Sequence, residues 1–210
     1  MKHLDHLFKD KKLKKIIDGQ KPYRLSRSKN IHLDLCNSIM SQQLSTKVAE
    51  IINARFIKLY EGEPSPERIM NTSTDKLRSI GLSNAKASYL QNVARFALDF
   101  GMDHAHLDKM ENEQIIEYLT QIKGVGKWTV EMILMFTLGR EDVFAIDDLG
   151  IQQSMAKLYK LDSRNKKKFR EELLSISDKW KPFRTYACIY LWRWKDAGAL
   201  QNKNKPKATR

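Results

Sequence analysis

Residues 119–130 read Leu119-Thr120-Gln121-Ile122-Lys123-Gly124-Val125-Gly126-Lys127-Trp128-Thr129-Val130. The pattern predicts that one helix ends at a Gly-x-Gly turn and that a second helix begins directly after it. Glycine permits positive φ and leaves no side chain between the backbone and a ligand. The N–H groups that open the second helix lack partners within it and carry the positive end of its dipole. Together these features predict a phosphate-binding turn.

Lys123 and Lys127 flank this turn and add positive charge without base specificity. A steric explanation stays open, in which the turn joins two helices tightly and needs glycine only for space. A dinucleotide-binding loop is excluded, because no strand precedes the turn and the third glycine of that motif is missing.

Helical periodicity extends over most of the chain. Ile31, Leu35 and Ile39 recur every four positions, and similar apolar stripes follow them. The chain holds 9 glycines and 5 prolines, few for an all-β protein with many turns. We therefore predict an all-α fold in which Ser65 and Ser83 cap two of the helices. Further helices are expected at residues 11–17, 74–80, 113–119, 127–138, 149–160, 166–176 and 184–194, before a basic tail at 201–210.

The composition favours a partner with many negative charges. Lys and Arg number 38 against 25 Asp and Glu, so the 210-residue chain has a formal charge of +13. This charge on a folded surface favours nucleic acid, although a basic protein without such a partner stays an alternative. No apolar run approaches the ~20 residues that cross a bilayer, and the N-terminus lacks a signal sequence. We therefore expect a cytoplasmic protein, nucleoid-associated if bacterial, without a membrane partner.

Metal chemistry finds little support in the sequence. Cys36 and Cys188 are too few for a four-cysteine zinc site or an iron–sulfur cluster. The five histidines show no HExxH pattern. No cofactor is expected to be required.

Several ordered segments over residues 30–195 resemble the helix–hairpin–helix DNA glycosylases, and within them the DNA-3-methyladenine glycosylase II branch. The segments are residues 39–45, 77–87, the 119–130 turn with Trp128-Thr129, 138–148, and 180–187 followed by Leu191-Trp192. The resemblance implies two helical lobes with a cleft between them: residues 35–125, and residues 1–34 with 126–200. The chain resembles a compact, single-module form that lacks the N-terminal β-containing domain of longer relatives.

The resemblance assigns catalysis to Asp148. Its carboxylate would stabilise the positive charge that develops on deoxyribose when an N-glycosidic bond breaks, and would orient or deprotonate water. From the residues alone, Asp147-Asp148 is better explained as a helix cap, because Asp is a favoured N-cap. We expect Asp147 to keep a capping or structural role.

The same resemblance implies an aromatic base pocket. Trp128 and Trp192 fall on pocket tryptophans, and Met132 stands where the better-known relative has tyrosine. An electron-rich ring attracts a cationic purine by ~0.5–2 kcal/mol per contact. Alternatively, both tryptophans are core residues.

DNA contacts are carried over in the same way. Gln43 or Leu44 would fill the stack vacated by a flipped base, and the alternative is a polar turn with a buried leucine. The hairpin formed by residues 119–130 would bind phosphates through Lys123, Gly124, Val125, Gly126, Lys127 and Thr129. Carbonyls of Thr120, Ile122 and Val125 would hold Na⁺ or K⁺.

Trp128 occupies the position where the family's bifunctional members carry a lysine nucleophile. Lys127 comes one residue earlier, about 100° around the helix. The sequence therefore predicts a monomeric, monofunctional hydrolase for base excision repair. It would remove alkylated purines of the 3-methyladenine and 7-methylguanine type from double-stranded DNA. The alternatives are a non-catalytic helix–hairpin–helix DNA-binding module, a glycosylase with a different damaged-base range, and a glycosylase–lyase.

Overall fold

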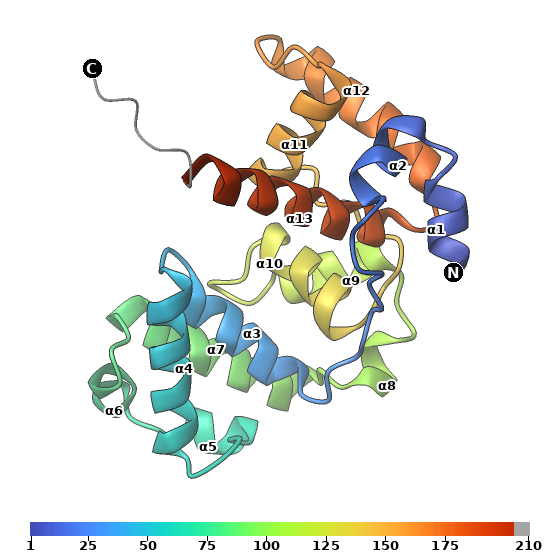
Figure 1. Ribbon diagram of the computed structural model, residues 1–210. Helices are drawn as coiled ribbons and strands as arrows, with labels where there is room; N and C mark the ends of the chain where they lie inside the picture. The colour runs from blue at the N-terminus through green and yellow to red at the C-terminus, as the bar shows by residue number, and fades with distance from the viewer. Residues whose placement is uncertain (204–210) are drawn as a thin grey trace, which may run out of the picture. The chain divides into compact units, whose positions relative to one another are not determined.

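The computed structural model describes the backbone of residues 1–203 and the side chains of residues 1–198. Every regular element in that range is helical, which confirms the predicted all-α class (Figure 1). The chain divides into two units. Unit 1 combines Met1–Leu25 with the chain from Arg140 onward, and unit 2 is the continuous segment Ser26–Gly139. Of the predicted basic tail, residues 201–203 continue the last helix and residues 204–210 lie outside the described residues.

These boundaries differ from the lobe limits expected near residues 35 and 126. The N–H of Ser28 donates to the carbonyl of Thr137 at 2.9 Å, and this bond joins the segment before the first helix of unit 2 to its last turn. Gly139 also packs against Ser26, whose carbonyl lies 3.3 Å from the position of a Cβ on that glycine. Both contacts keep residues 26–34 and 126–139 within unit 2.

Unit 2 is organised around one long helix, α7 (Asn84–Phe100). Its buried face carries the predicted apolar residues Ala87, Leu90, Val93 and Ala94, against which α3, α5 and α6 pack. The elements of unit 2 besides α7 are α3 (Ile31–Ser41), α4 (Thr46–Leu59), α5 (Pro66–Met70), α6 (Thr74–Ser79), α8 (His104–Leu107), α9 (Asn112–Leu119), α10 (Lys127–Met132) and a π-helical turn (Ile133–Thr137).

Caps set several of these helix starts, as the sequence indicates. The Ser83 hydroxyl accepts a hydrogen bond from the N–H of Lys86 and so begins α7. Ser65 is the N-cap residue of α5, with Pro66 as the first helical residue, but the Ser65 side chain forms no capping hydrogen bond. The stretch 101–108 contains α8, because the Asp103 carboxylate caps a single helical turn there.

Unit 1 joins the two ends of the described chain. Its helices are α1 (Lys2–Leu7), α2 (Lys11–Ile17), α11 (Leu149–Tyr159), α12 (Lys166–Ser177) and α13 (Arg184–Lys203), with a 3-10 turn at Asp178–Trp180. Residues 186–191 of α13 are all buried, and α13 packs against both α11 and α2. The N–H of Tyr23 donates to the Tyr190 hydroxyl at 3.0 Å and fastens the segment after α2 to α13. Unit 1 therefore depends on residues from both ends of the sequence.

Within residues 1–203, no helix has both the length and the apolar character needed to cross a membrane.

Candidate active site

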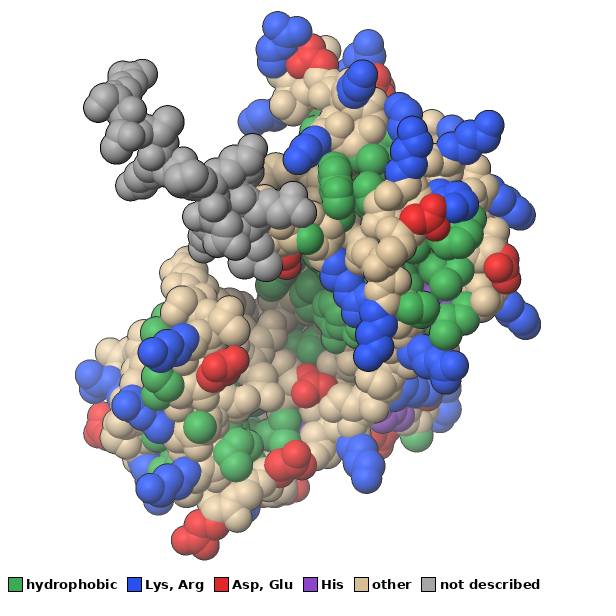
Figure 2. All heavy atoms as spheres, in the orientation of Figure 1, with side chains coloured by type: hydrophobic (Ala, Val, Ile, Leu, Met, Phe, Trp, Pro, Cys, Tyr) green, Lys and Arg blue, Asp and Glu red, His purple; other side chains and the backbone are tan. Residues whose placement is uncertain are grey.

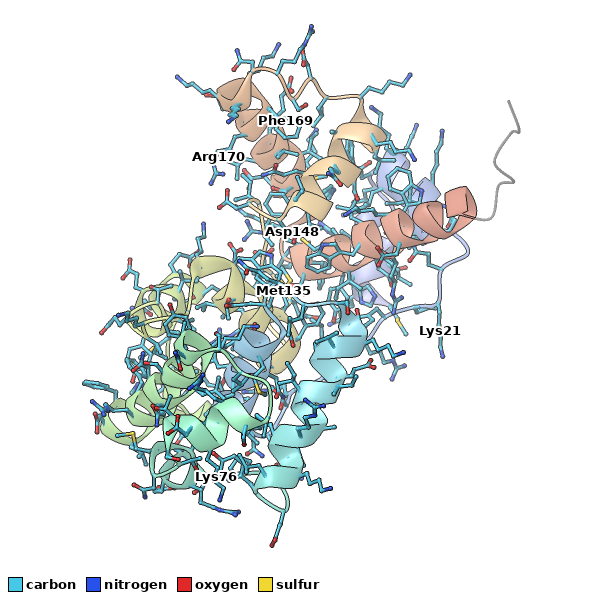
Figure 3. The ribbon with its side chains drawn as sticks, turned by 90° about the vertical axis from the view of Figure 1, so that its left-hand side faces the viewer. Lys21, Lys76, Met135, Asp148, Phe169 and Arg170 are labelled. Atoms are coloured by element: carbon cyan, nitrogen blue, oxygen red, sulfur yellow. The ribbon has the colours of Figure 1, made fainter. Side chains whose placement is uncertain are left out.

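Asp148 begins helix α11 in unit 1 (Figure 3). Its Oδ1 accepts two hydrogen bonds: one from the N–H of Ile151 at 2.8 Å and one from the indole Nε1 of Trp192 at 2.9 Å. The residue is half-buried. The carboxylate is therefore held in one orientation by its own helix and by α13.

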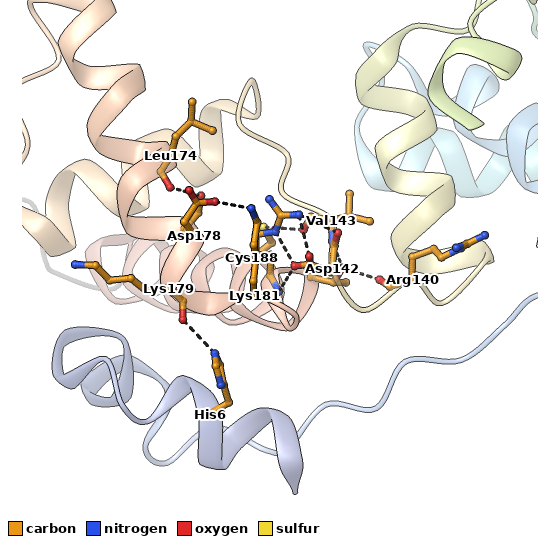
Figure 4. A network of polar contacts seen from close by, with 12 residues as sticks. His6, Arg140, Asp142, Val143, Leu174, Asp178, Lys179, Lys181 and Cys188 are labelled. Carbon is orange, nitrogen blue, oxygen red and sulfur yellow. Dashed lines mark hydrogen bonds and ion pairs between the residues drawn. The ribbon is translucent and has the colours of Figure 1, made fainter. Parts of the chain in front are cut away.

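The loop before Asp148 is fixed onto the start of α13. The Thr185 hydroxyl donates to the Arg140 carbonyl at 2.6 Å and accepts from the N–H of Val143 at 3.0 Å (Figure 4). Arg184 holds Asp142 with two side-chain hydrogen bonds of 2.6 and 2.9 Å. The buried residues 143–146 connect these contacts to Asp148, the cap of α11. Asp148 is thus positioned by packed structure on both sides.

Asp148 is the cap of α11, so of the two roles expected for Asp147 the capping role is wrong. The Asp147 side chain instead forms an ion pair with Arg170 of α12, with 2.6 Å between Oδ1 and a guanidinium nitrogen. Both side chains are about half exposed, so the pair contributes at most ~1 kcal/mol. The two neighbouring carboxylates thus have separate partners on separate helices.

Gly150 leaves room for this arrangement. A Cβ at position 150 would lie 3.0 Å from the Asp148 Oδ1, 3.2 Å from a Trp192 ring carbon and 3.3 Å from the Lys195 ammonium. Three side chains from two helices therefore converge on the space that a larger residue would fill. Lys195 brings a positive charge close to Asp148.

The Gly-x-Gly turn lies in unit 2, and its two glycines have different requirements. Gly124 has φ +104°, and a Cβ there would lie 2.3 Å from the ring of Tyr89 on α7. The Asn92 side chain, also on α7, donates to the Lys123 carbonyl at 3.2 Å. By contrast, a Cβ on Gly126 would meet nothing within 4 Å. The steric explanation therefore accounts for Gly124 but not for Gly126.

The predicted contact residues around this turn vary in exposure. Lys123, Gly126 and Lys127 are exposed, and Lys127 lies 3.7 Å from the buried Glu131 carboxylate. Thr129 is buried, so its side chain does not present a surface to DNA. The Val125 side chain is also buried.

The predicted base-contact residues divide between the units. Trp128, on α10 of unit 2, is 45% exposed, which contradicts its alternative interpretation as a core residue. Met132 ends the same helix and is half-buried. Trp192 belongs to unit 1, where it contacts Asp148.

The turn also offers carbonyl oxygens to a monovalent cation. The Ile122 carbonyl accepts a hydrogen bond from the Val125 N–H at 2.9 Å, which leaves its second lone pair for a ligand. Backbone carbonyls suit Na⁺ and K⁺, and the cation site at Thr120, Ile122 and Val125 stays a prediction. Within the described residues, no cluster of three or more His, Cys, Asp or Glu side chains is arranged for a metal ion.

The Gln43-Leu44 turn connects α3 to α4 in unit 2. Gln43 is exposed and has φ +58°, an unusual backbone conformation for a side chain of its kind. Lys86 of α7 donates from its ammonium to the carbonyls of Met40 and Gln42, at 2.8 and 2.7 Å. Burial lowers the pKa of this lysine. Leu44 is half-buried, so its exposure lies between that of a residue that enters the base stack and that of a buried leucine.

Sequence reasoning missed several residues that support these sites. Gly150 lies two positions after Asp148, and Lys195 follows Trp192 by three, a spacing that puts both on one helix face. Both spacings can be read from the sequence and could have indicated these two residues. Tyr89 and Lys86 gave no such signal, because their partners are more than thirty positions away along the chain.

Comparison with known proteins identifies the family. Residues 36–179 match the model of the HhH-GPD superfamily base excision DNA repair proteins. The chain belongs to this superfamily. The predicted helix–hairpin–helix glycosylase family is thereby confirmed.

Similar proteins within the superfamily span nearly the whole chain. DNA-3-methyladenine glycosylase 1 of Schizosaccharomyces pombe is 34% identical over 94% of this chain and 86% of its own length. The structure of that yeast's 3-methyladenine DNA glycosylase (Mag1) in complex with abasic DNA has a TM-score of 0.78, covering 92% of this chain and 96% of that one. A DNA-3-methyladenine glycosidase structure from Bacillus halodurans is 32% identical, with a TM-score of 0.82, and covers 95% of this chain and 91% of its own.

The two hairpin glycines allow the steric role and the phosphate-binding role to be tested separately. We expect Gly126→Asp to fold like the parent and to lower DNA affinity at least tenfold for all sequences, because a side chain and a negative charge enter the phosphate-binding turn. Gly126→Ala, with a Cβ in open space, tests size without charge. Fluorescence anisotropy with labelled duplexes measures affinity, and circular dichroism measures folding. Unchanged affinity in Gly126→Asp would contradict the phosphate role.

Gly150→Ala tests the packing around the carboxylate. The added methyl group would meet Asp148 and Trp192, so we expect their hydrogen bond to break or lengthen and base excision to slow at least tenfold. The Trp192 indole N–H resonance measures the bond by NMR. Gly198→Ala on α13, the helix that carries Trp192, is the control, since its Cβ meets nothing within 4 Å. An unmoved resonance with full activity would show that the space at position 150 is not needed.

Proposed function

We propose that the protein is a monofunctional DNA glycosylase of base excision repair that hydrolyses the N-glycosidic bond of alkylated purines in double-stranded DNA. The activity class, alkylbase DNA glycosylase, is that of its named relatives. The observation that carries the mechanism is the Asp148 carboxylate, held at a helix N-terminus by Ile151 and Trp192. The complex of the related yeast enzyme with abasic DNA fits a reaction that leaves an abasic site.

Asp148 supplies negative charge where the reaction develops positive charge. Departure of the base leaves an oxocarbenium-like deoxyribose, and a preorganised carboxylate stabilises it without reorganisation. The N–H groups and dipole at the start of α11 favour a negative charge at this position. The carboxylate also orients a water molecule and accepts its proton as the new C–O bond forms.

A single carboxylate suffices for a base that is already cationic. A purine alkylated at N3 or N7 carries a positive charge and leaves as a neutral base, so no general acid has to protonate it. We assign base recognition to the rings of Trp128 and Trp192 and to Met132. Since the Trp192 N–H is bonded to Asp148, its contribution to the base comes from the ring. Attraction between such rings and a cation amounts to ~0.5–2 kcal/mol per contact.

DNA binding is assigned to the hairpin and to the Gln43-Leu44 turn. The hairpin N–H groups with Lys123 and Lys127 would bind phosphates, and a Na⁺ or K⁺ on the hairpin carbonyls would add a positive charge beside them. Gln43, exposed in its constrained turn, is the residue that we expect to enter the base stack. Lys and Arg side chains are spread widely over the visible surface (Figure 2), consistent with sequence-independent phosphate binding. We further propose that the enzyme acts as a monomer in the compartment that holds the DNA.

Asp148→Asn separates the catalytic role from the capping role. Asparagine caps helices as well as aspartate does and keeps an oxygen acceptor for Ile151 and Trp192. We therefore expect a folded protein that binds DNA but releases 3-methyladenine at least about 10²-fold more slowly, the loss typical of removing one electrostatic group. Chromatography of bases released from methylated DNA measures the rate.

The matched control is Asp147→Asn. It removes the neighbouring carboxylate, whose partner is Arg170 on a different helix, and should excise within about twofold of the parent rate. If Asp148→Asn excises at the parent rate, the catalytic assignment is wrong. A parent protein that binds DNA and releases no base would favour the non-catalytic DNA-binding module, in which Asp148 only caps α11.

The monofunctional mechanism predicts that no covalent intermediate forms. Incubation with abasic DNA and borohydride should trap no protein–DNA adduct, because Trp128 stands where bifunctional relatives have their lysine. Denaturing electrophoresis measures the adduct, with a bifunctional glycosylase as the positive control. A trapped adduct that disappears in Lys127→Gln or Lys195→Gln would identify the protein as a glycosylase–lyase.

A further inference from the structure

Unit 1 contains a cavity that the proposed glycosylase chemistry does not use. It measures about 560 Å³ and lies among α1, α2, α11, α12 and the 3-10 turn. Tyr159, the last residue of α11, lines it, whereas Asp148 precedes the first residue of that helix. At 1.5 Å per residue, the 11 residues of α11 put its two ends about 15 Å apart. The cavity is therefore separate from the candidate active site.

The floor of the cavity is built around the carboxylate of Asp10. Its Oδ1 accepts from the backbone N–H groups of Lys12 and Leu13 at 3.0 and 3.1 Å. Its Oδ2 accepts from the Tyr159 hydroxyl at 2.6 Å and from the Trp180 indole at 3.2 Å. Burial opposes the ionisation of Asp10, but these hydrogen bonds outweigh it and lower the pKa of the carboxyl below its usual value. Asp10 is thus fully engaged in holding the walls together.

Four lysines surround this floor: Lys9, Lys11, Lys12 and Lys179. All four are exposed at the rim. None forms an ion pair with a carboxylate of the described residues. The Lys12 ammonium instead lies 5.2 Å from the centre of the Tyr159 ring. Four ammonium groups against one carboxylate give the cavity a local charge of about +3, concentrated in a space of small-molecule size.

The position of Lys179 is set by a contact between the chain ends. Its carbonyl is hydrogen-bonded to the ring Nε2 of His6 on α1 at 3.1 Å (Figure 4). The adjacent Trp180 side chain is buried and bonded to Asp10. Lys179 therefore extends from backbone that is held by α1 and by the buried Trp180.

We propose that this cavity is a binding site for a phosphate group carried on a partly apolar molecule, as in a nucleotide. Lysine ammonium groups bind phosphate oxygens as point charges, and at least two phosphate charges are needed to balance the excess. Tyr159 and Ile176 supply apolar wall for the rest of the ligand. The volume lies within the ~300–1,000 Å³ typical of small-molecule sites. The phosphate comes from a free nucleotide or from the backbone of bound DNA.

The test uses the whole protein with inorganic pyrophosphate and dAMP as probes. The Trp180 indole N–H resonance reports binding by NMR, since that group lies in the cavity wall, and the Trp192 resonance reports the active site. The triple variant Lys9→Gln/Lys12→Gln/Lys179→Gln removes three cavity charges. The matched control Lys2→Gln/Lys58→Gln/Lys109→Gln removes three exposed charges elsewhere. Both variants keep Asp148, so excision of 3-methyladenine confirms folding independently of this site.

If the ligand is a free nucleotide, pyrophosphate and dAMP should both shift the Trp180 indole resonance and leave the Trp192 resonance in place. The cavity variant, unlike the control variant, should bind these probes at least tenfold more weakly than the parent. For DNA backbone, the salt dependence of duplex binding should weaken in the cavity variant alone, by about 2.7 in the log–log slope for three phosphate contacts. Either result supports the site. It is overturned if neither probe shifts Trp180 and both variants have equal salt slopes. Binding of hexaglutamate as tight as that of pyrophosphate would also overturn the phosphate assignment.

Discussion

The hydrogen bond between the Trp192 indole and the Asp148 carboxylate connects the candidate chemistry to the core of unit 1. Trp192 follows directly after the buried residues 186–191 of α13, and Asp148 is the N-cap of α11, which packs against that helix. The position of the carboxylate is therefore set by the packing of two helices. Gly150 is part of the same constraint, since it leaves the space in which both side chains and Lys195 meet.

The sequence presents capping and catalysis by Asp148 as competing explanations, and the proposed catalytic role is compatible with the observed cap. Its Oδ1 satisfies the first turn of α11, as in an ordinary N-cap, and the same contact fixes the direction of its charge. Capping does not diminish the case for catalysis, because a carboxylate immobilised at the positive end of a helix is suited to stabilise a cationic sugar. The hairpin follows a similar logic. Gly124 is required by Tyr89, whereas Gly126 leaves open space beside the exposed residues Lys127 and Trp128.

Local signals in the sequence predicted the fold well, and long-range contacts limited the rest. Periodicity and caps such as Ser83 indicated the helices, because both depend on residues within one or two turns. The Gly-x-Gly turn and Asp148 were identifiable by motif. The partners were not: Tyr89 lies 35 positions before Gly124, and Asp147 pairs with Arg170 across 23 positions. Such pairings follow from the packing of whole helices. For the same reason the unit boundaries fall at residues 26 and 139.

The composition of unit 1 from both ends of the chain has a consequence for synthesis. Unit 2 is continuous, so its core around α7 is complete once residue 139 has left the ribosome. Unit 1 cannot complete its core until α13 is synthesised, because α2 and the Tyr23 backbone pack against buried residues of that helix. Until then the apolar face of α2, with Leu13, Ile16 and Ile17, has no core to enter. The candidate active site therefore forms last during synthesis, when α13 places Trp192 beside Asp148.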